Sequence, residues 1–138
     1  MRSSVLLDTC AVIWTLKHAP LSIASRNAIR RAFSTNAGVY VSPFSAWEIG
    51  MLVSKGHIEL SRAPEMLFDE LIAMPGTRLA PLTPRILLSS SFLPGTPPKD
   101  LADRIIAATA RELGHILITR DTKLLAYAQQ GHIRAIAC

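Results

Sequence analysis

Acidic residues are scarce in this chain, and cysteine is rarer still. Ten of the 138 residues are Asp or Glu, against fifteen Lys and Arg, so the formal charge is +5. The two cysteines, Cys10 and Cys138, cannot form a disulfide framework, which indicates a cytoplasmic protein. No apolar run reaches the roughly 18 residues of a membrane span. The short apolar start, interrupted by Asp8, is not a secretory signal, so we expect no membrane segment.

Several common site motifs are absent as well. The chain has no phosphate-binding loop and no glycine-rich dinucleotide fingerprint. Its histidines lack the close spacing of zinc ligands, which argues against a zinc site; they are His18, His57, His115 and His132. No repeat, low-complexity tract or long linker divides the sequence, so residues 1–138 are expected to form one domain.

Short apolar runs alternate with helical patterns along the whole chain. The apolar runs predict strands at residues 4–8, 39–42, 77–82, 116–119 and 133–137. The helical patterns cover residues 11–17, 22–34, 43–54, 64–74, 84–90, 100–113 and 122–129. Several strands are continuously apolar, which is typical of parallel strands covered on both faces. We therefore predict an α/β fold, a three-layer α/β/α sandwich with a central, mainly parallel sheet of roughly five strands.

Four of the acids stand where an acid is least expected. Asp8 and Asp121 each follow an apolar run, at the carboxyl end of a predicted strand. Asp103 lies in the first turn of an Ala-rich helix. Glu48 shares a helical face with apolar residues, which are Phe44, Met51 and Leu52. A carboxylate buried without a partner costs several kcal/mol. These acids therefore suggest one pocket for a hard divalent cation, Mg²⁺ or Mn²⁺.

Each acid also has a plainer interpretation. Asp8 and Asp121 could cap the helices that follow them, and Glu48 could point to solvent. Asp100 and Asp103 are three residues apart and share one face of a helix start. We assign the helix cap mainly to Asp100 and a place at the metal to Asp103.

Basic residues near these acids suggest a polyanionic substrate. A basic rim around an acidic, metal-filled centre suits a phosphodiester attacked in the middle of a polyanion. The candidates for phosphate contacts are Lys99, Arg104, Arg120 and Lys123. A second cluster on the helix at 22–34 consists of Arg26, Arg30 and Arg31. For each of these side chains, an ordinary solvated charge is the alternative.

Four segments carry a family resemblance. They are Leu6-Leu7-Asp8-Thr9, Ser45-Ala46-Trp47-Glu48-Ile49, Asp100-Leu101-Ala102-Asp103-Arg104-Ile105-Ile106-Ala107-Ala108-Thr109-Ala110 and Ile118-Thr119-Arg120-Asp121. In this order they resemble the motifs of the PIN-domain family, and most closely VapC-type ribonuclease toxins of bacterial toxin–antitoxin pairs. The third segment is quite specific, whereas the first is weak by itself. The resemblance covers essentially the whole chain.

The resemblance implies a PIN-like fold and a metal-dependent endoribonuclease that uses Mg²⁺ or Mn²⁺ to hydrolyse RNA. Carried over position by position, it implies catalytic and metal-binding roles for Asp8, Glu48, Asp103 and Asp121. The supporting residues are Thr9, Thr119 and Asp100. The chain departs from the family pattern at Pro98-Lys99, where relatives often have His-Arg, and in ending without an aromatic residue. The first departure bears on substrate contacts, and neither removes a metal ligand.

The same resemblance implies a small cognate antitoxin as partner, and we also expect a homodimer. An amphipathic antitoxin segment would lie in an apolar groove between the early helices and extend an Arg or Lys toward the acids. The candidates for this groove are Leu16, Leu21, Ile23, Leu52 and Val53. For each of them, a place in the core or at a homodimer face is the alternative.

Two other functions compete with the ribonuclease. A catalytically inactive PIN-like module could bind RNA or protein and use its acids only to stabilise the fold. A hydrolase of small phosphoesters would need a second Asp two residues after Asp8, where this chain has Cys10. Cys10 could be a nucleophile, but no base lies near it in sequence, so a buried structural thiol is the favoured interpretation. The motifs do not distinguish transfer, ribosomal and messenger RNA as the substrate.

Overall fold

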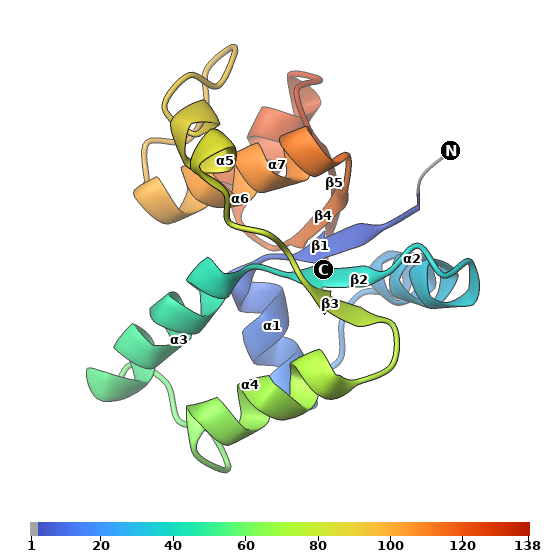
Figure 1. The fold of residues 1–138 in the computed structure, drawn as a ribbon, viewed down its shortest axis with the longest axis vertical. Helices are drawn as coiled ribbons and strands as arrows, with labels where there is room; N and C mark the ends of the chain where they lie inside the picture. The colour runs from blue at the N-terminus through green and yellow to red at the C-terminus, as the bar shows by residue number, and fades with distance from the viewer. Residues whose placement is uncertain (1–2) are drawn as a thin grey trace.

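A five-stranded parallel sheet forms the centre of the protein (Figure 1). The structure is a computed structural model that describes residues 3–138. The strands are β1 (Val5–Leu7), β2 (Val39–Val41), β3 (Thr77–Leu79), β4 (Ile116–Thr119) and β5 (Arg134–Ala137). Their order is β3-β2-β1-β4-β5, so β1 pairs with β2 on one side and with β4 on the other. The predicted α/β fold with a parallel sheet is confirmed.

Helices cover both faces of this sheet. One face carries α1 (Thr9–Leu16), α2 (Ile23–Ser34), α3 (Pro43–Ser54) and α4 (Pro64–Ala73). The other carries α5 (Pro84–Ser89), α6 (Leu101–Leu113) and α7 (Thr122–Gln129). In Figure 1, α1, α3 and α4 lie below the sheet, α2 appears at the right at the height of the strands, and α5, α6 and α7 lie above. Successive side chains of a strand point to opposite faces, so Val5 and Leu7 join the first core and Leu6 joins the second.

All predicted helices and strands are present, with ends that differ by a few residues. The third strand was predicted to run to residue 82 but ends at Leu79, because Pro81 has no amide hydrogen to continue the ladder. The first helix begins at Thr9, two residues before the predicted start, because Asp8 caps it. The sixth helix ends before Gly114, whose positive φ of 71° provides a left-handed C-cap.

The carboxyl ends of the parallel strands share one edge of the sheet, and this edge positions the acids. β1 leads directly into Asp8, and β4 leads through Arg120 into Asp121. β2 leads into Ser42, whose side chain accepts a hydrogen bond from the Phe44 N–H and caps α3. Ligands of parallel α/β sheets bind at this edge.

Among residues 3–138, no helix combines the length and the apolar character that crossing a membrane requires.

Candidate functional site

One pocket at the carboxyl edge gathers the four predicted acids. It has a volume of about 360 Å³ and draws its walls from α1, α3, α6 and the β4–α7 connection. Its lining residues are Asp8, Thr9, Cys10, Ile13, Glu48, Leu52, Asp103, Ile106, Arg120 and Asp121. Acids that are far apart in the sequence therefore face one common space. We call this space the acid pocket.

Asp8 is the most buried of the four acids, with 5% of its surface exposed. Its Oδ1 accepts hydrogen bonds from the Ala11 N–H (2.9 Å) and the Cys10 thiol (2.8 Å), and its Oδ2 accepts one from the Thr119 hydroxyl. Burial raises the pKa of Asp8 above its ordinary value, although these three hydrogen bonds oppose the rise. Thr119 thus supports this carboxylate, as the resemblance implied. The capping interpretation also describes a real contact, because Asp8 caps α1.

Glu48 reaches the pocket from α3 and is held by α1. The Thr9 hydroxyl donates to Glu48 Oε1, and Thr9 Oγ1 lies 2.9 Å from the Ser45 hydroxyl oxygen. Burial, followed by the charges of Asp100 and Asp8, raises the pKa of Glu48. Phe44, Met51 and Leu52, the apolar residues expected to share a helical face with Glu48, are only half-buried. The residues of α3 that face the core are Ser45 and Ile49. Glu48 therefore lies at the border of the buried face rather than within it.

The helix cap that the sequence predicted at Asp100 is present in the structure. Asp100 caps α6, because its Oδ2 accepts a hydrogen bond of 3.2 Å from the Asp103 N–H. The Asp103 side chain makes no hydrogen bond within the described residues and lines the pocket. Burial raises the pKa of Asp103 to about 7, and the charges of Asp121, Asp100, Glu48 and Asp8 add to the rise. Whether Asp103 binds metal stays a prediction.

Asp121 combines a helix cap with a place in the pocket. Its Oδ1 accepts hydrogen bonds from the Lys123 N–H (2.7 Å) and the Leu124 N–H (3.2 Å), which caps α7. The Asp121 N–H in turn donates to Thr119 Oγ1 at 3.0 Å. Thr119 therefore links the first acid to the fourth.

The donor set of the pocket fits a hard divalent cation. Each acid retains a carboxylate oxygen with open acceptor capacity after the hydrogen bonds above are counted. These oxygens are Asp8 Oδ2, Glu48 Oε2, Asp121 Oδ2 and both oxygens of Asp103. Oxygen ligands suit Mg²⁺ and Mn²⁺. Across the described residues, no three Asp, Glu, His or Cys side chains already stand close enough together to hold an ion. The carboxylates must therefore move inward to bind one.

The four predicted phosphate contacts are placed differently from one another. Arg120 lines the acid pocket. Arg104 does not, because its Nη1 donates to the Ser90 carbonyl at 3.1 Å and ties α6 to the end of α5. Lys99 and Lys123 are exposed on segments that adjoin the pocket. Arg26, Arg30 and Arg31 are exposed on α2, as a solvated cluster would be.

Two contacts in the pocket were not predicted from the sequence. Cys10 was expected to be a buried structural thiol, but it is half-buried, lines the pocket and donates to Asp8. Burial and the Asp8 charge raise the pKa of Cys10 to about 12, which makes it a poor nucleophile at neutral pH. Ser45 is fully buried beside Thr9. Two signals in the sequence could have indicated these contacts. Ser45 stands three residues before Glu48, and Cys10 stands two residues after Asp8.

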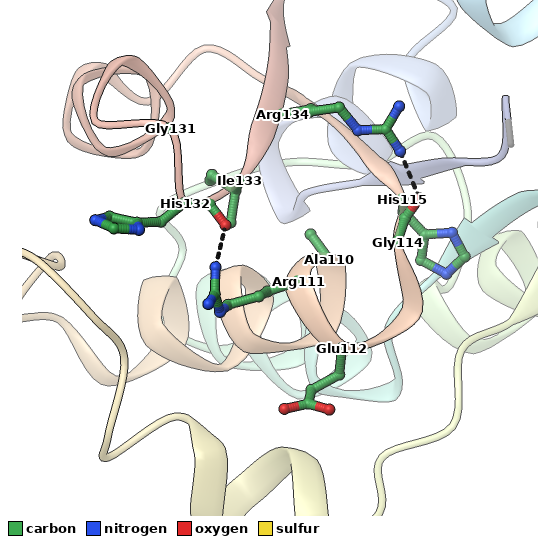
Figure 2. A pocket seen from close by; sticks show the side chains of 9 residues that line it. All are labelled: Ala110, Arg111, Glu112, Gly114, His115, Gly131, His132, Ile133 and Arg134. Carbon is green, nitrogen blue, oxygen red and sulfur yellow. Dashed lines mark hydrogen bonds between the residues drawn. The ribbon is translucent and has the colours of Figure 1, made fainter. Parts of the chain in front are cut away.

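A second hollow lies at the opposite edge of the sheet, where β4 and β5 begin (Figure 2). Its volume is about 340 Å³, and two arginines line it. Arg111 donates to the His132 carbonyl at 2.8 Å, and Arg134 donates to the Gly114 carbonyl at 2.7 Å, as Figure 2 shows. These cations satisfy main-chain carbonyls, including one at the end of α6. The acid pocket is therefore the stronger candidate site.

Two hollows lie between the early helices, but of the residues predicted to line an apolar groove there only Leu16 lines either of them. One lies between α3 and α4 with a volume of about 270 Å³, and the other between α1 and α4 with about 340 Å³. Of the predicted groove residues, Leu16 is buried in the core and Val53 packs against it. Ile23 is 69% exposed, and Leu52 lines the acid pocket.

Comparison with known proteins supports a family assignment. The profile of the PIN domain matches residues 5–130. The chain is 32% identical over 123 residues to Ribonuclease VapC22 of Mycobacterium tuberculosis, covering 88% of this chain and 90% of that protein. Its fold is similar to Rickettsia felis VapBC2 bound to a DNA fragment from their promoter (TM-score 0.69, 13% identity, 97% and 98% coverage). It is also similar to FitAB bound to an IR36 DNA fragment (TM-score 0.60, 19% identity, 96% and 94% coverage).

Proposed function

Because the chain belongs to the PIN-domain family, we propose that it is a metal-dependent endoribonuclease and the toxin of a toxin–antitoxin pair. One observation carries the proposal: four carboxylates from four separate segments line a single pocket and keep open oxygens. The ribonuclease name of the 32% identical relative supports RNA as the substrate class. The proposal places the protein in the cytoplasm, where such RNA is found.

Mg²⁺ or Mn²⁺ would be held by Asp8, Glu48, Asp103 and Asp121. When bound, the ion would supply an activated water and neutralise charge on the phosphate. Three of these acids have raised pKa values in the ion-free protein, and for all three burial is the largest cause. Ion binding would therefore release protons, and the protein should bind the ion more tightly as pH rises.

Neighbouring residues keep the carboxylates in place. Thr119 and the Ala11 N–H orient Asp8, and Thr9 orients Glu48. The Cys10 thiol and the Ala11 N–H both donate to Asp8 Oδ1, so Oδ2, which accepts only the Thr119 hydroxyl, is the oxygen that would bind an ion. Hydrogen-bonded carboxylates lose less freedom on binding, because their rotamers are already fixed.

The mutational test compares two acids in the same helix turn. Asp103→Asn keeps the side-chain shape but removes the charge, so RNA cleavage in Mg²⁺ should fall by orders of magnitude while the fold persists. Asp100→Asn is the matched control and should retain most activity, because Asn also caps helices well. Cleavage by Asp103→Asn at the wild-type rate would show that the proposed site is wrong, and would favour the catalytically inactive module.

The partner we propose is a small antitoxin that docks beside the acid pocket. The fold is similar to VapBC2 of Rickettsia felis and to FitAB, and in this chain a hollow between α3 and α4 is lined by Ile49, the residue that follows Glu48. An amphipathic helix in that hollow could extend a basic side chain to the carboxylates. Co-expression with the small open reading frame beside its gene should yield one copurifying, inactive complex. Separate elution with full ribonuclease activity would contradict this part of the proposal.

A homodimer stays a prediction. Three apolar side chains are exposed on the segment from α5 to the first residue of α6. They are Leu88 (66% exposed), Phe92 (82%) and Leu101 (63%). Exposed apolar side chains on a small domain are typical of interaction surfaces.

A further inference from the structure

Among residues 3–138, Arg120 is the only basic residue that lines the acid pocket. It stands next to Asp121 in the chain, and Asp8, Glu48 and Asp103 line the same space. An arginine in such surroundings would be expected to form charge-assisted bonds with the carboxylates. It does not, since within residues 3–138 the ion pairs are Arg62–Glu70 and Arg85–Glu112.

Two contacts hold the Arg120 side chain away from the acids. Its guanidinium carbon lies 3.6 Å from the ring centroid of Trp14 on α1, a close cation–π contact. Its Nε donates to the main-chain oxygen of Cys138 at 2.7 Å. The Arg120 N–H also points to Cys10 Sγ at 3.4 Å, so both the main chain and the side chain are fixed against α1.

Held in this way, Arg120 forgoes ion pairs with the nearby carboxylates, and fold stability alone does not explain that loss. An indole face is a weaker partner for a guanidinium than a carboxylate is. The side chain remains exposed, although it also interacts with the Cys138 thiol and opposes the rise in the pKa of that thiol that burial causes. The arrangement therefore leaves two things available at once: four carboxylates without a cation, and a fixed cation at their rim.

We propose that Trp14 is a positioning residue that holds Arg120 at the rim of the acid pocket, unpaired with the acids, so that the carboxylates stay open to a divalent ion and Arg120 receives an RNA phosphate. This inference rests on the proposed ribonuclease function and deepens it. A planar guanidinium stacked on an aromatic ring keeps its outer edge for a phosphate, which a lysine in its place could not do as well.

The test separates metal binding from RNA binding. Mn²⁺ binding is measured as the rise in melting temperature over each variant's own ion-free value. RNA binding is measured by fluorescence anisotropy of a short, labelled single-stranded RNA in EDTA. In Trp14→Leu, Arg120 is released to pair with the acids, so the Mn²⁺ response should shrink by half or more. RNA affinity should fall about tenfold, as expected on losing an ordered phosphate contact.

Three further variants show whether Trp14 acts through Arg120. Trp14→Phe keeps an aromatic face and should behave almost like the wild type. Arg120→Gln should lose RNA affinity but keep the Mn²⁺ response. The double variant Trp14→Leu with Arg120→Gln should recover the Mn²⁺ response, because the competing cation is gone, while RNA binding stays weak. Arg120→Lys should reproduce Trp14→Leu and covers the case in which Trp14→Leu fails to fold.

The inference is overturned if Trp14→Leu or Arg120→Lys retains both responses, or if the double variant still responds weakly to Mn²⁺. It also fails if Arg120→Gln binds RNA normally and loses only antitoxin binding. A wild-type chain that neither binds RNA nor responds to Mn²⁺ would contradict the proposed function itself, and this inference with it.

Discussion

At the scale of single residues, the acids of the pocket share their oxygens between structure and chemistry. Asp8 and Asp121 each use one oxygen to cap a helix and leave the other facing the pocket. One carboxylate side chain could therefore serve both as a helix cap and as a metal ligand. Asp103 differs, because its carboxyl has no hydrogen bond among the described residues and carries the electrostatic cost of its neighbours.

That cost leads to a prediction about pH. The pKa of Asp103 rises from an ordinary 3.8 to about 7 in the folded protein, so the fold holds this proton more tightly than the unfolded chain does. The protonated Asp103 carboxyl therefore stabilises the fold. This stabilisation is complete below pH 3.8 and is lost as pH rises to about 7. In EDTA, Asp103→Asn should therefore gain stability over the wild type with rising pH. The gain should reach roughly 1–2 kcal/mol by about pH 8, reduced by the screening of a half-exposed group.

Urea unfolding of both proteins at about pH 4 and about pH 8 measures this difference. Asp100→Asn is the second comparison: the Asp100 charge is one cause of the raised pKa of Asp103, so this variant should show a smaller change of the same sign. If instead the free energy of unfolding of the wild type rises relative to that of Asp103→Asn as pH increases, the fold stabilises the Asp103 carboxyl as an anion.

At the scale of elements, α6 shows how one helix start serves two purposes. Asp100 caps the helix and fixes its first turn, and this places Asp103 on the pocket side. Behind them, Ile105 and Ile106 are buried and dock the helix on the sheet. The position of Asp103 is therefore set by a cap at one end and by core packing along the length of the helix.

The cap itself is testable. Asp100→Ala should lower the free energy of unfolding by about 0.5–2 kcal/mol, because the Asp103 N–H loses its acceptor. Asp100→Asn should stay within a few tenths of a kcal/mol of the wild type, since the amide oxygen can accept the same bond. Guanidinium denaturation of the two variants gives both values. Equal losses in both would mean that the charge of Asp100, rather than its hydrogen bond, stabilises the helix.

At the scale of the whole molecule, the parallel sheet brings acids from distant segments to one edge. Burial is the largest cause of the raised pKa values of Asp8, Glu48 and Asp103, and the charges of neighbouring acids add to the rise. A ligand that binds only the folded arrangement stabilises it by mass action.

Divalent ions should therefore raise the melting temperature of the wild-type chain. The stabilisation reaches about 2.7 kcal/mol at an ion concentration a hundred times the Kd. A thermal-shift titration with Mn²⁺ measures it, with potassium at equal ionic strength as the control for screening. The shift should shrink in Asp8→Asn and in Glu48→Gln. If the curves coincide at every Mn²⁺ concentration, the acids serve only as caps and surface charge.

The sequence allows the four acids and the sheet to be predicted, because both signals are local. A carboxylate after an apolar run and a Ser-Pro helix start can each be recognised from a few neighbours. Cys10 and Ser45 were missed because their contacts depend on how α1 docks against α3. Arg104 beside the third acid was a candidate for phosphate binding; its Nη1 donates to the Ser90 carbonyl, a contact that depends on α5 and that the sequence does not indicate. The stacking of Arg120 on Trp14 likewise depends on the docking of α1 beside β4.

The pairing of β1 with β4 also determines when the site can exist. Leu7 pairs with Ile118, and Asp8 accepts a hydrogen bond from Thr119, a partner 111 residues away in the chain. Contacts of such long range form late, because a large loop must first be closed. A chain still being synthesised can therefore fold its first helices without assembling the acid pocket. On the proposed function, a growing toxin stays harmless until β4 and Asp121 have been made and β4 has been inserted beside β1, so catalytic competence is acquired only near the end of synthesis.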